Sequence, residues 1–197
     1  MPEKEALLII DTINSCCARE YELPGRGIKF SRIRKMVPLL EKYVSRYRKN
    51  GGRIIFVACT PWTREFLPRN IRALYDNFPS SRYYSEDSTG KAEDFYMVRP
   101  VEGEKVFRKS SYDAFTNPAL GKFLRRNGIE TLLISGVFSD ACVNATINGA
   151  FSRGYSVRIL GDLVETTDSR TRQRLQKLLK EYSWPILYGP VISSRVS

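Results

Sequence analysis

Short apolar runs alternate with helix-like segments along most of this chain. The apolar runs lie at residues 5–10, 53–58, 105–108, 131–135 and 155–160, and apolar residues recur at helical spacing in 32–50, 117–127 and 140–153. Neighbouring parallel strands need a crossover between them, and helical crossovers cover the faces of the sheet. The alternation therefore predicts an α/β protein with a mainly parallel sheet covered on both faces.

The C-terminal part completes this pattern. Residues 169–182 are strongly amphipathic and predict a last helix, and Pro185–Tyr188 is the expected sixth strand. Pro38 falls inside the 32–50 pattern, so that helix should start late or bend. Because the sequence contains no repeat and no linker, we expect a single domain over residues 1–197. Its expected architecture is a three-layer αβα, Rossmann-like fold with six strands in the order 3-2-1-4-5-6.

Residues from about 61 to 100 lose this periodicity and are rich in aromatic residues, arginine and proline. A short helix is expected near Asn70–Asp76. Long excursions from compact domains are often functional, so we expect this segment to act as a lid.

Composition restricts the location and the partners of the protein. No apolar run reaches the roughly 18–20 residues that span a bilayer, and the N-terminus lacks the pattern of a signal peptide. The four cysteines show no disulfide spacing, which favours reduced thiols in a cytoplasmic protein without a membrane partner. The formal charge of +11 would permit nucleic-acid binding. Its basic residues are scattered over predicted helices, however, so we favour a solvated surface and expect no nucleic-acid partner.

A reactive cysteine is suggested by the run I-S-G-V-F-S-D-A-C-V-N, residues 134–144. An apolar strand ends near Gly136, and Cys142 falls where the next helix should begin. Helix N-termini stabilise negative charge, so a cysteine there tends towards the nucleophilic thiolate. A buried structural cysteine is the alternative, because one cysteine at such a junction is weak evidence.

Two further candidates follow other strands. Asp11 comes after the first strand and Lys109 after the third, and ligands of open α/β sheets bind beyond such carboxyl ends. Alone, Asp11 could cap a turn and Lys109 could be solvated. Together with Cys142 they form a complete chemical set: Asp11 accepts the thiol proton, Lys109 favours the charged forms and Cys142 attacks. The sequence contains no histidine, which removes the commonest general base and metal ligand.

Three segments resemble the isochorismatase-like cysteine hydrolases, a family that includes nicotinamidases and N-carbamoylsarcosine amidase. They are A-L-L-I-I-D-T-I-N (6–14), K-S-S-Y-D-A-F (109–115) and G-V-F-S-D-A-C-V-N-A-T (136–146). The likeness covers roughly residues 5 to 182, in the right order.

The resemblance implies a catalytic triad of Asp11, Lys109 and Cys142. It also implies an oxyanion hole from the backbone N–H groups of Phe138 and Cys142, with a cis peptide bond between Val137 and Phe138. A homodimer or homotetramer is expected from the same likeness.

The chain departs from the nicotinamidases after its second strand. Trp62 and Arg64 stand about where their metal-binding aspartate and first histidine would fall, so we expect no histidine-based metal site, no cofactor and no nicotinamide substrate. We expect Asn14, Trp62, Arg64, Tyr112 and Phe115 to line a pocket for a compact planar or carboxylate-bearing small molecule. Trp62 could instead anchor the excursion, and Arg64 could face water.

We therefore hypothesise an amidohydrolase that cleaves a small amide, carbamoyl or ureido-type C–N bond through a thioester on Cys142. Three alternatives remain open. The protein could be a catalytically silent small-molecule-binding or scaffold protein of the same fold, which a pocket filled by Phe138 would favour. It could hydrolyse a vinyl ether, as isochorismatases proper do, or it could bind nucleic acid.

Overall fold

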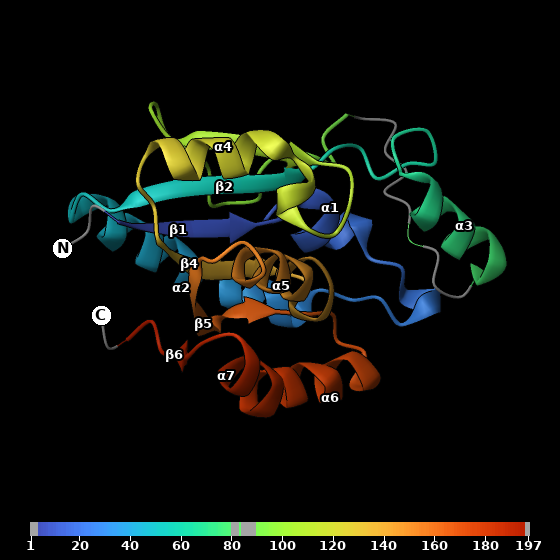
Figure 1. The fold of residues 1–197 in the computed structure, drawn as a ribbon. Helices are drawn as coiled ribbons and strands as arrows, with labels where there is room; N and C mark the ends of the chain where they lie inside the picture. Colours follow the sequence, from blue (N-terminus) through green and yellow to red (C-terminus); the bar gives the residue numbers. More distant parts are fainter. Residues whose placement is uncertain (1–3, 80–82, 84–89, 196–197) are drawn as a thin grey trace.

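The computed structural model describes residues 4–79, 83 and 90–195 of the 197-residue chain. Six strands form one parallel sheet in the order β3-β2-β1-β4-β5-β6, which confirms the predicted fold class (Figure 1). The strands are β1 (Glu5–Ile10), β2 (Arg53–Cys59), β3 (Lys105–Lys109), β4 (Thr131–Val137), β5 (Ser156–Glu165) and β6 (Val191–Ile192).

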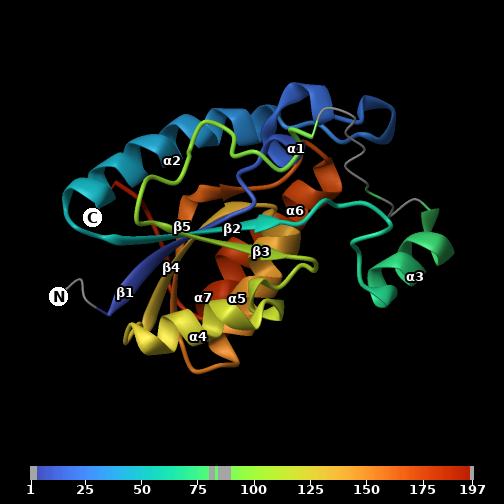
Figure 2. The same cartoon turned by 90° about the horizontal axis from the view of Figure 1, so that it is seen from above.

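Helices cover the two faces of this sheet in separate layers (Figure 2). The longest, α2 (Ser31–Lys49), packs on the face that contains Leu7 and Ile9. The opposite face, with Leu8 and Ile10, packs against α4 (Pro118–Arg126), α5 (Asn144–Phe151) and α7 (Trp184–Leu187). Alternate residues of β1 thus enter different cores, as expected for a strand that is buried on both faces. The other helices are α1 (Asn14–Cys17), α3 (Arg69–Asn77) and α6 (Arg170–Leu178).

The expected sixth strand at Pro185–Tyr188 is wrong. Residues Trp184–Leu187 are helical, and β6 follows at Val191–Ile192. Trp184 explains the difference, since its fully buried side chain packs in the core beneath α5 and donates from Nε1 to Asn144 Oδ1 at 2.9 Å. Pro185 is tolerated because it lies in the first turn of α7. The helix with Pro38 in its interior starts at Ser31, so it does not start late.

The excursion after β2 contains α3 and returns to the sheet beside the end of β1. Asn14 N–H donates to Asp94 O at 2.8 Å, and Tyr96 N–H donates to Thr12 O at 2.9 Å. An antiparallel bridge joins Ile13 to Phe95 between these bonds. This return places Phe95 and Tyr96 beside the residues that follow β1. None of the helices in the described part of the chain has the length and apolar composition of a bilayer crossing.

Candidate active site

The backbone at the end of β4 is shaped by Gly136. This residue has φ of 112°, and a Cβ atom there would lie 2.1 Å from Ile10 O in the neighbouring strand. Only glycine therefore allows β4 to approach β1 so closely. The peptide bond between Val137 and Phe138 is cis, at the position that the family resemblance implies. A π-helical turn over Ser139–Val143 then places Cys142 at the entrance to α5.

Asp11, Lys109 and Cys142 meet at the carboxyl edge of the sheet. Lys109 Nζ lies 2.8 Å from Asp11 Oδ2 and donates to Cys142 Sγ at 3.2 Å. Asp11 has a left-handed backbone, with φ of 51°, and its N–H donates to Val57 O at 2.8 Å. Sparsely populated backbone conformations of this kind persist where surrounding contacts hold them, often at functional sites.

The Lys109 side chain is fully buried, and 1% of the Asp11 side chain is exposed. Burial alone would lower the pKa of Lys109, but the negative charge of Asp11 outweighs it and raises this pKa well above its ordinary value. Lys109 is therefore a permanent ammonium, and it places positive charge beside the Cys142 sulfur.

Cys59 is a second thiol in this cluster that we did not anticipate. It ends β2, and its Sγ lies 3.2 Å from Asp11 Oδ1 and 3.4 Å from Lys109 Nζ. Four adjacent strands thus each supply one group: Lys109 from β3, Cys59 from β2, Asp11 from β1, and Cys142 just beyond β4. The argument from strand ends that selected Asp11 and Lys109 also applies to Cys59, so the signal was present in the sequence.

Within the described residues, Asp11, Cys59 and Cys142 form a group that could hold a metal ion, since their ligand atoms lie within 4.8 Å of one another. The Lys109 ammonium contacts all three, so a metal ion would have to displace it. The two positions that correspond to nicotinamidase ligands are engaged elsewhere. Trp62 Nε1 donates to Tyr75 OH at 3.0 Å, and Arg64 pairs with Asp76. We therefore assign no metal to this site.

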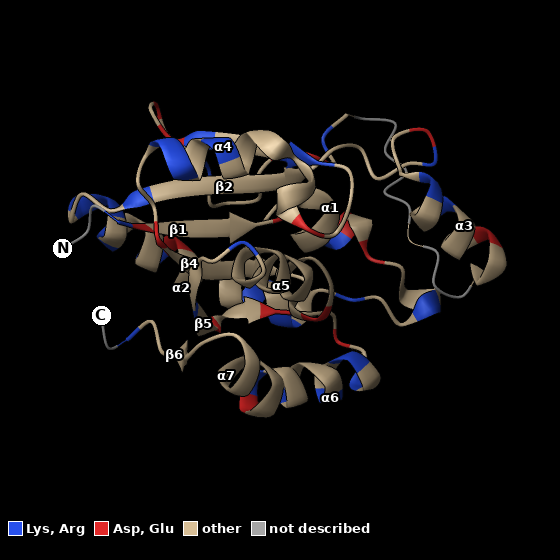
Figure 3. Ribbon diagram, in the orientation of Figure 1, with Lys and Arg blue, Asp and Glu red and all other residues tan. Residues whose placement is uncertain are grey.

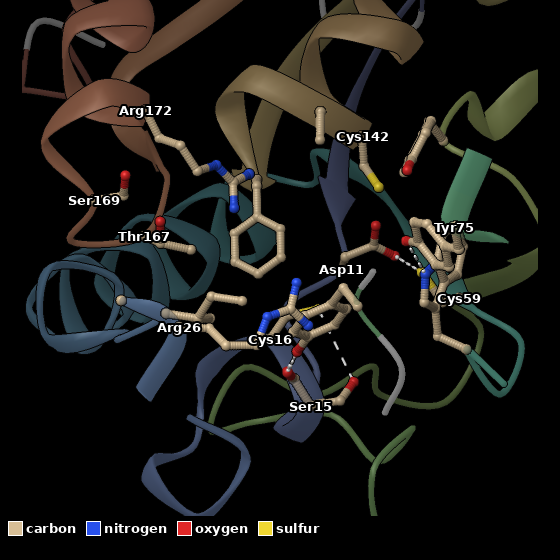
Figure 4. A pocket seen from close by; sticks show the side chains of 17 residues that line it. Asp11, Ser15, Cys16, Arg26, Cys59, Tyr75, Cys142, Thr167, Ser169 and Arg172 are labelled. Carbon is tan, nitrogen blue, oxygen red and sulfur yellow. Dashed lines mark hydrogen bonds between the residues drawn. The ribbon is translucent and has the colours of Figure 1, made fainter. Parts of the chain in front are cut away.

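A cavity of about 350 Å³ opens beside Asp11, Cys59 and Cys142 (Figure 4). Much of its wall is aromatic: the side chains of Trp62, Tyr75, Tyr83, Tyr112 and Phe138 line it. Trp62 and Tyr112 pack against each other with ring centroids 5.6 Å apart. Because Phe138 forms part of the wall and leaves the cavity open, it does not block access to Cys142.

Two arginines give the opposite side of the cavity a positive charge. The guanidinium groups of Arg26 and Arg172 point towards its middle, with Asp11 and Cys142 across from them (Figure 4). Asp140 fixes the Arg172 guanidinium by accepting from Nε at 2.6 Å and from Nη2 at 2.7 Å, and the same guanidinium lies 4.8 Å from the centre of the Phe138 ring. Thr167 also lines the cavity, and its buried hydroxyl finds no hydrogen-bond partner among the described residues.

The structure brings some of the five expected pocket residues to the cavity and places others elsewhere. Trp62 and Tyr112 line it. Asn14 instead donates from Nδ2 to Lys91 O at 2.9 Å, and the exposed Arg64 pairs with Asp76 across the surface of the excursion. Phe115 stacks on Tyr155 in the core under α5, with centroids 5.7 Å apart. The expectation that Asn14, Arg64 and Phe115 line the pocket therefore needs correction. Their positions in the sequence do not determine where their side chains point.

Comparisons with known proteins agree on one family. A family model described as the isochorismatase domain matches residues 5–187. The uncharacterized isochorismatase family protein YddQ of Bacillus subtilis is 25% identical over 170 residues, which cover 86% of this chain and 82% of YddQ. The ureidoacrylate amidohydrolase RutB of Klebsiella pneumoniae is 25% identical over 173 residues, which cover 82% of this chain and 73% of RutB.

Solved structures share the fold. A cysteine hydrolase from Pseudomonas syringae superposes with a TM-score of 0.80 at 18% identity, covering 99% of this chain and 91% of that one. The N-carbamoylsarcosine amidase of Thermoplasma acidophilum gives a TM-score of 0.68 at 23% identity, with coverages of 97% and 96%. With the family model spanning nearly the whole sequence, the chain belongs to the isochorismatase family of hydrolases.

Proposed function

We propose that this protein hydrolyses a small amide, carbamoyl or ureido-type C–N bond through a thioester on Cys142. The observation that carries the proposal is the buried ammonium of Lys109, which lies between the Asp11 carboxylate at 2.8 Å and the Cys142 sulfur at 3.2 Å. An ammonium in this position stabilises the thiolate, and a carboxylate within the same cluster can accept the thiol proton.

The reaction follows from these three groups. Asp11 takes the proton of Cys142, and the sulfur attacks the carbonyl carbon to form a tetrahedral oxyanion. Backbone N–H groups of Phe138 and Cys142 are the proposed donors to that oxyanion. Asp11 returns the proton to the departing nitrogen as the C–N bond breaks, which leaves the thioester. A water molecule then gives a proton to Asp11 and attacks the thioester, and the thiol leaves with that proton.

The cavity supports a small substrate that carries a negative charge. Its volume of about 350 Å³ suits a compact molecule, and its aromatic wall suits a planar one. Arg26 and Arg172 face the nucleophile across the cavity, where either guanidinium can bind a carboxylate. The ureidoacrylate amidohydrolase and the N-carbamoylsarcosine amidase among the relatives favour a ureido or carbamoyl compound. The segment 61–100, which supplies Trp62 and Tyr75, is the proposed lid, and its residues 80–82 and 84–89 lie outside the described part of the chain.

Intact-protein mass spectrometry after incubation with a panel of ureido and carbamoyl acids tests this proposal. A transient adduct that matches the acyl group should form on the native protein, and peptide mapping should place it on Cys142. Cys142→Ala should form no adduct and show no turnover, while its circular dichroism stays native. Full turnover by Cys142→Ala on an accepted substrate would refute the thioester mechanism.

The other hypotheses have less support. A catalytically silent binding protein is disfavoured because the cavity stays open beside Cys142. Nucleic-acid binding is disfavoured because Lys and Arg lie on α3, α4 and α6, on different sides of the molecule (Figure 3). A nucleic-acid site usually gathers such charge on one face or along one helix.

A further inference from the structure

Cys59 and Lys109 leave the sheet side by side. They are register partners at the ends of β2 and β3, and Thr60 N–H donates to Lys109 O at 2.8 Å just beyond them. Cys59 Sγ thereby reaches 3.2 Å from Asp11 Oδ1, while Lys109 Nζ contacts the other oxygen, Oδ2. The two oxygens of Asp11 are thus contacted by groups from β2 and β3.

The direction of the Cys59 hydrogen bond follows from its partners. An ionised carboxylate only accepts hydrogen bonds, so the Cys59 thiol must donate its S–H to Asp11. Cys59 also keeps this proton. A hydrogen bond with Cys142, then burial, then the negative charge of Asp11 raise the pKa of Cys59 well above its ordinary value. Both sulfurs accept from Lys109 Nζ, Cys59 at 3.4 Å and Cys142 at 3.2 Å, and what distinguishes Cys59 is that its S–H donates to Asp11 Oδ1.

We propose that Cys59 is a positioning residue, whose S–H holds the Asp11 carboxylate by Oδ1 while Lys109 holds it by Oδ2. This inference rests on the proposed function, because the held carboxylate is the group that exchanges protons with Cys142. Two contacts from two strands fix the rotation of the carboxylate and keep it within the cluster. Loss of a donor to this carboxylate should therefore change the pH dependence of turnover, which a loss of packing alone would not do.

Substitutions at Cys59 separate this role from simple packing. Cys59→Ala and Cys59→Val both remove the donor, and Val fills the space that Ala leaves. Both should lower kcat by roughly tenfold to a hundredfold, the range expected for one hydrogen bond to a charged group. The dependence of kcat on pH should also differ from that of the native protein in both variants. Cys59→Ser keeps a donor and should restore the native rate and profile.

Cys17→Ala is the matched control. Cys17 is another buried free thiol of the same core, and it lies outside the cavity lining. Its removal should leave the rate profile unchanged. If Cys59→Val matches the native protein in both kcat and pH profile, Cys59 does not position Asp11. If Cys59→Ser behaves like Cys59→Val, the defect is one of packing and the inference also fails.

A measurement without substrate keeps this test independent of the proposed function. The rate of alkylation of Cys142 by iodoacetamide, followed against pH by peptide mapping, reports on the same cluster. The profile of Cys59→Val should be displaced from that of the native protein, and that of Cys59→Ser should coincide with it. Coincident profiles for all three proteins would overturn the inference about Cys59. Turnover by Cys142→Ala would instead overturn the proposed function.

Discussion

Replacing Lys109 by methionine tests the central contact of the site. The side chains of Lys109 and Asp11 are 0% and 1% exposed, and methionine keeps most of the volume of lysine while losing the charge. Asp11 would then be a buried carboxylate without its ammonium partner. Breaking a buried ion pair in this way costs about 3–5 kcal/mol. With a urea m-value of about 2 kcal/mol/M, the unfolding midpoint should fall by roughly 1.5–2.5 M.

The unfolding assay has its own probes, because both tryptophans, Trp62 and Trp184, are buried and their emission should shift on exposure to water. Lys4→Met is the matched control. Lys4 Nζ lies 2.7 Å from Glu130 Oε1, nearly the distance in the buried pair, but these side chains are 68% and 64% exposed. Exposed pairs contribute about 0–1 kcal/mol, so Lys4→Met should change the midpoint little.

A double variant guards against complete loss of folding. Asp11→Asn in the Lys109→Met background removes the unpaired charge, so this protein should recover most of the lost stability. Equal urea midpoints for Lys109→Met and Lys4→Met would refute the reasoning, because burial would then have no effect on the strength of the pair.

Three further predictions concern the backbone, the acid stability and the cavity. Gly136→Ala should unfold the protein or cost more than about 3 kcal/mol in urea, because its Cβ would meet Ile10 O, whereas Gly154→Ala, with φ of 85° and open space, should cost about 1–2 kcal/mol. Burial alone would raise the pKa of Asp162, but hydrogen bonds from Ser194 and Ser193 lower it. The ionised Asp162 side chain therefore stabilises the fold above the ordinary aspartate pKa, and this stabilisation is lost as the pH falls through the lowered value. Asp162→Ala should therefore be about 1 kcal/mol less stable than the native protein at pH 7, and the two urea curves should converge once the pH falls below the lowered pKa; a constant difference would contradict this. Arg26→Gln should raise KM about tenfold for a carboxylate-bearing amide and leave KM for its neutral amide analogue unchanged, and equal effects on both would argue against a carboxylate contact.

The sequence predicted those features that depend on pattern alone. Strand ends follow from where apolar runs stop, so the convergence of Asp11, Lys109 and Cys142 at one sheet edge could be expected before the structure. The strand order also agreed, because alternating strands and helices restrict the possible topologies. Cys59 could have been found by the same argument, since it ends the strand next to β1.

Features that depend on tertiary packing could not be read in this way. The W-P-I-L segment at 184–187 has an apolar pattern that fits a strand or a helix equally, and burial of Trp184 under α5 decides for the helix. Arg172 belongs to an amphipathic helix and was grouped with the surface charges, yet Asp140 holds it at the cavity. Phe115 lies close to Lys109 in the sequence, but its side chain packs in the core under α5 and does not line the cavity.

Because the site takes one group from each of four neighbouring strands, its reactivity exists only in the finished sheet. A nascent or partly unfolded chain carries the same thiols, but none of them is activated. Any opening that frees β1, β2 or β3 would separate Cys142, the proposed nucleophile, from at least one of the groups that contact one another around it.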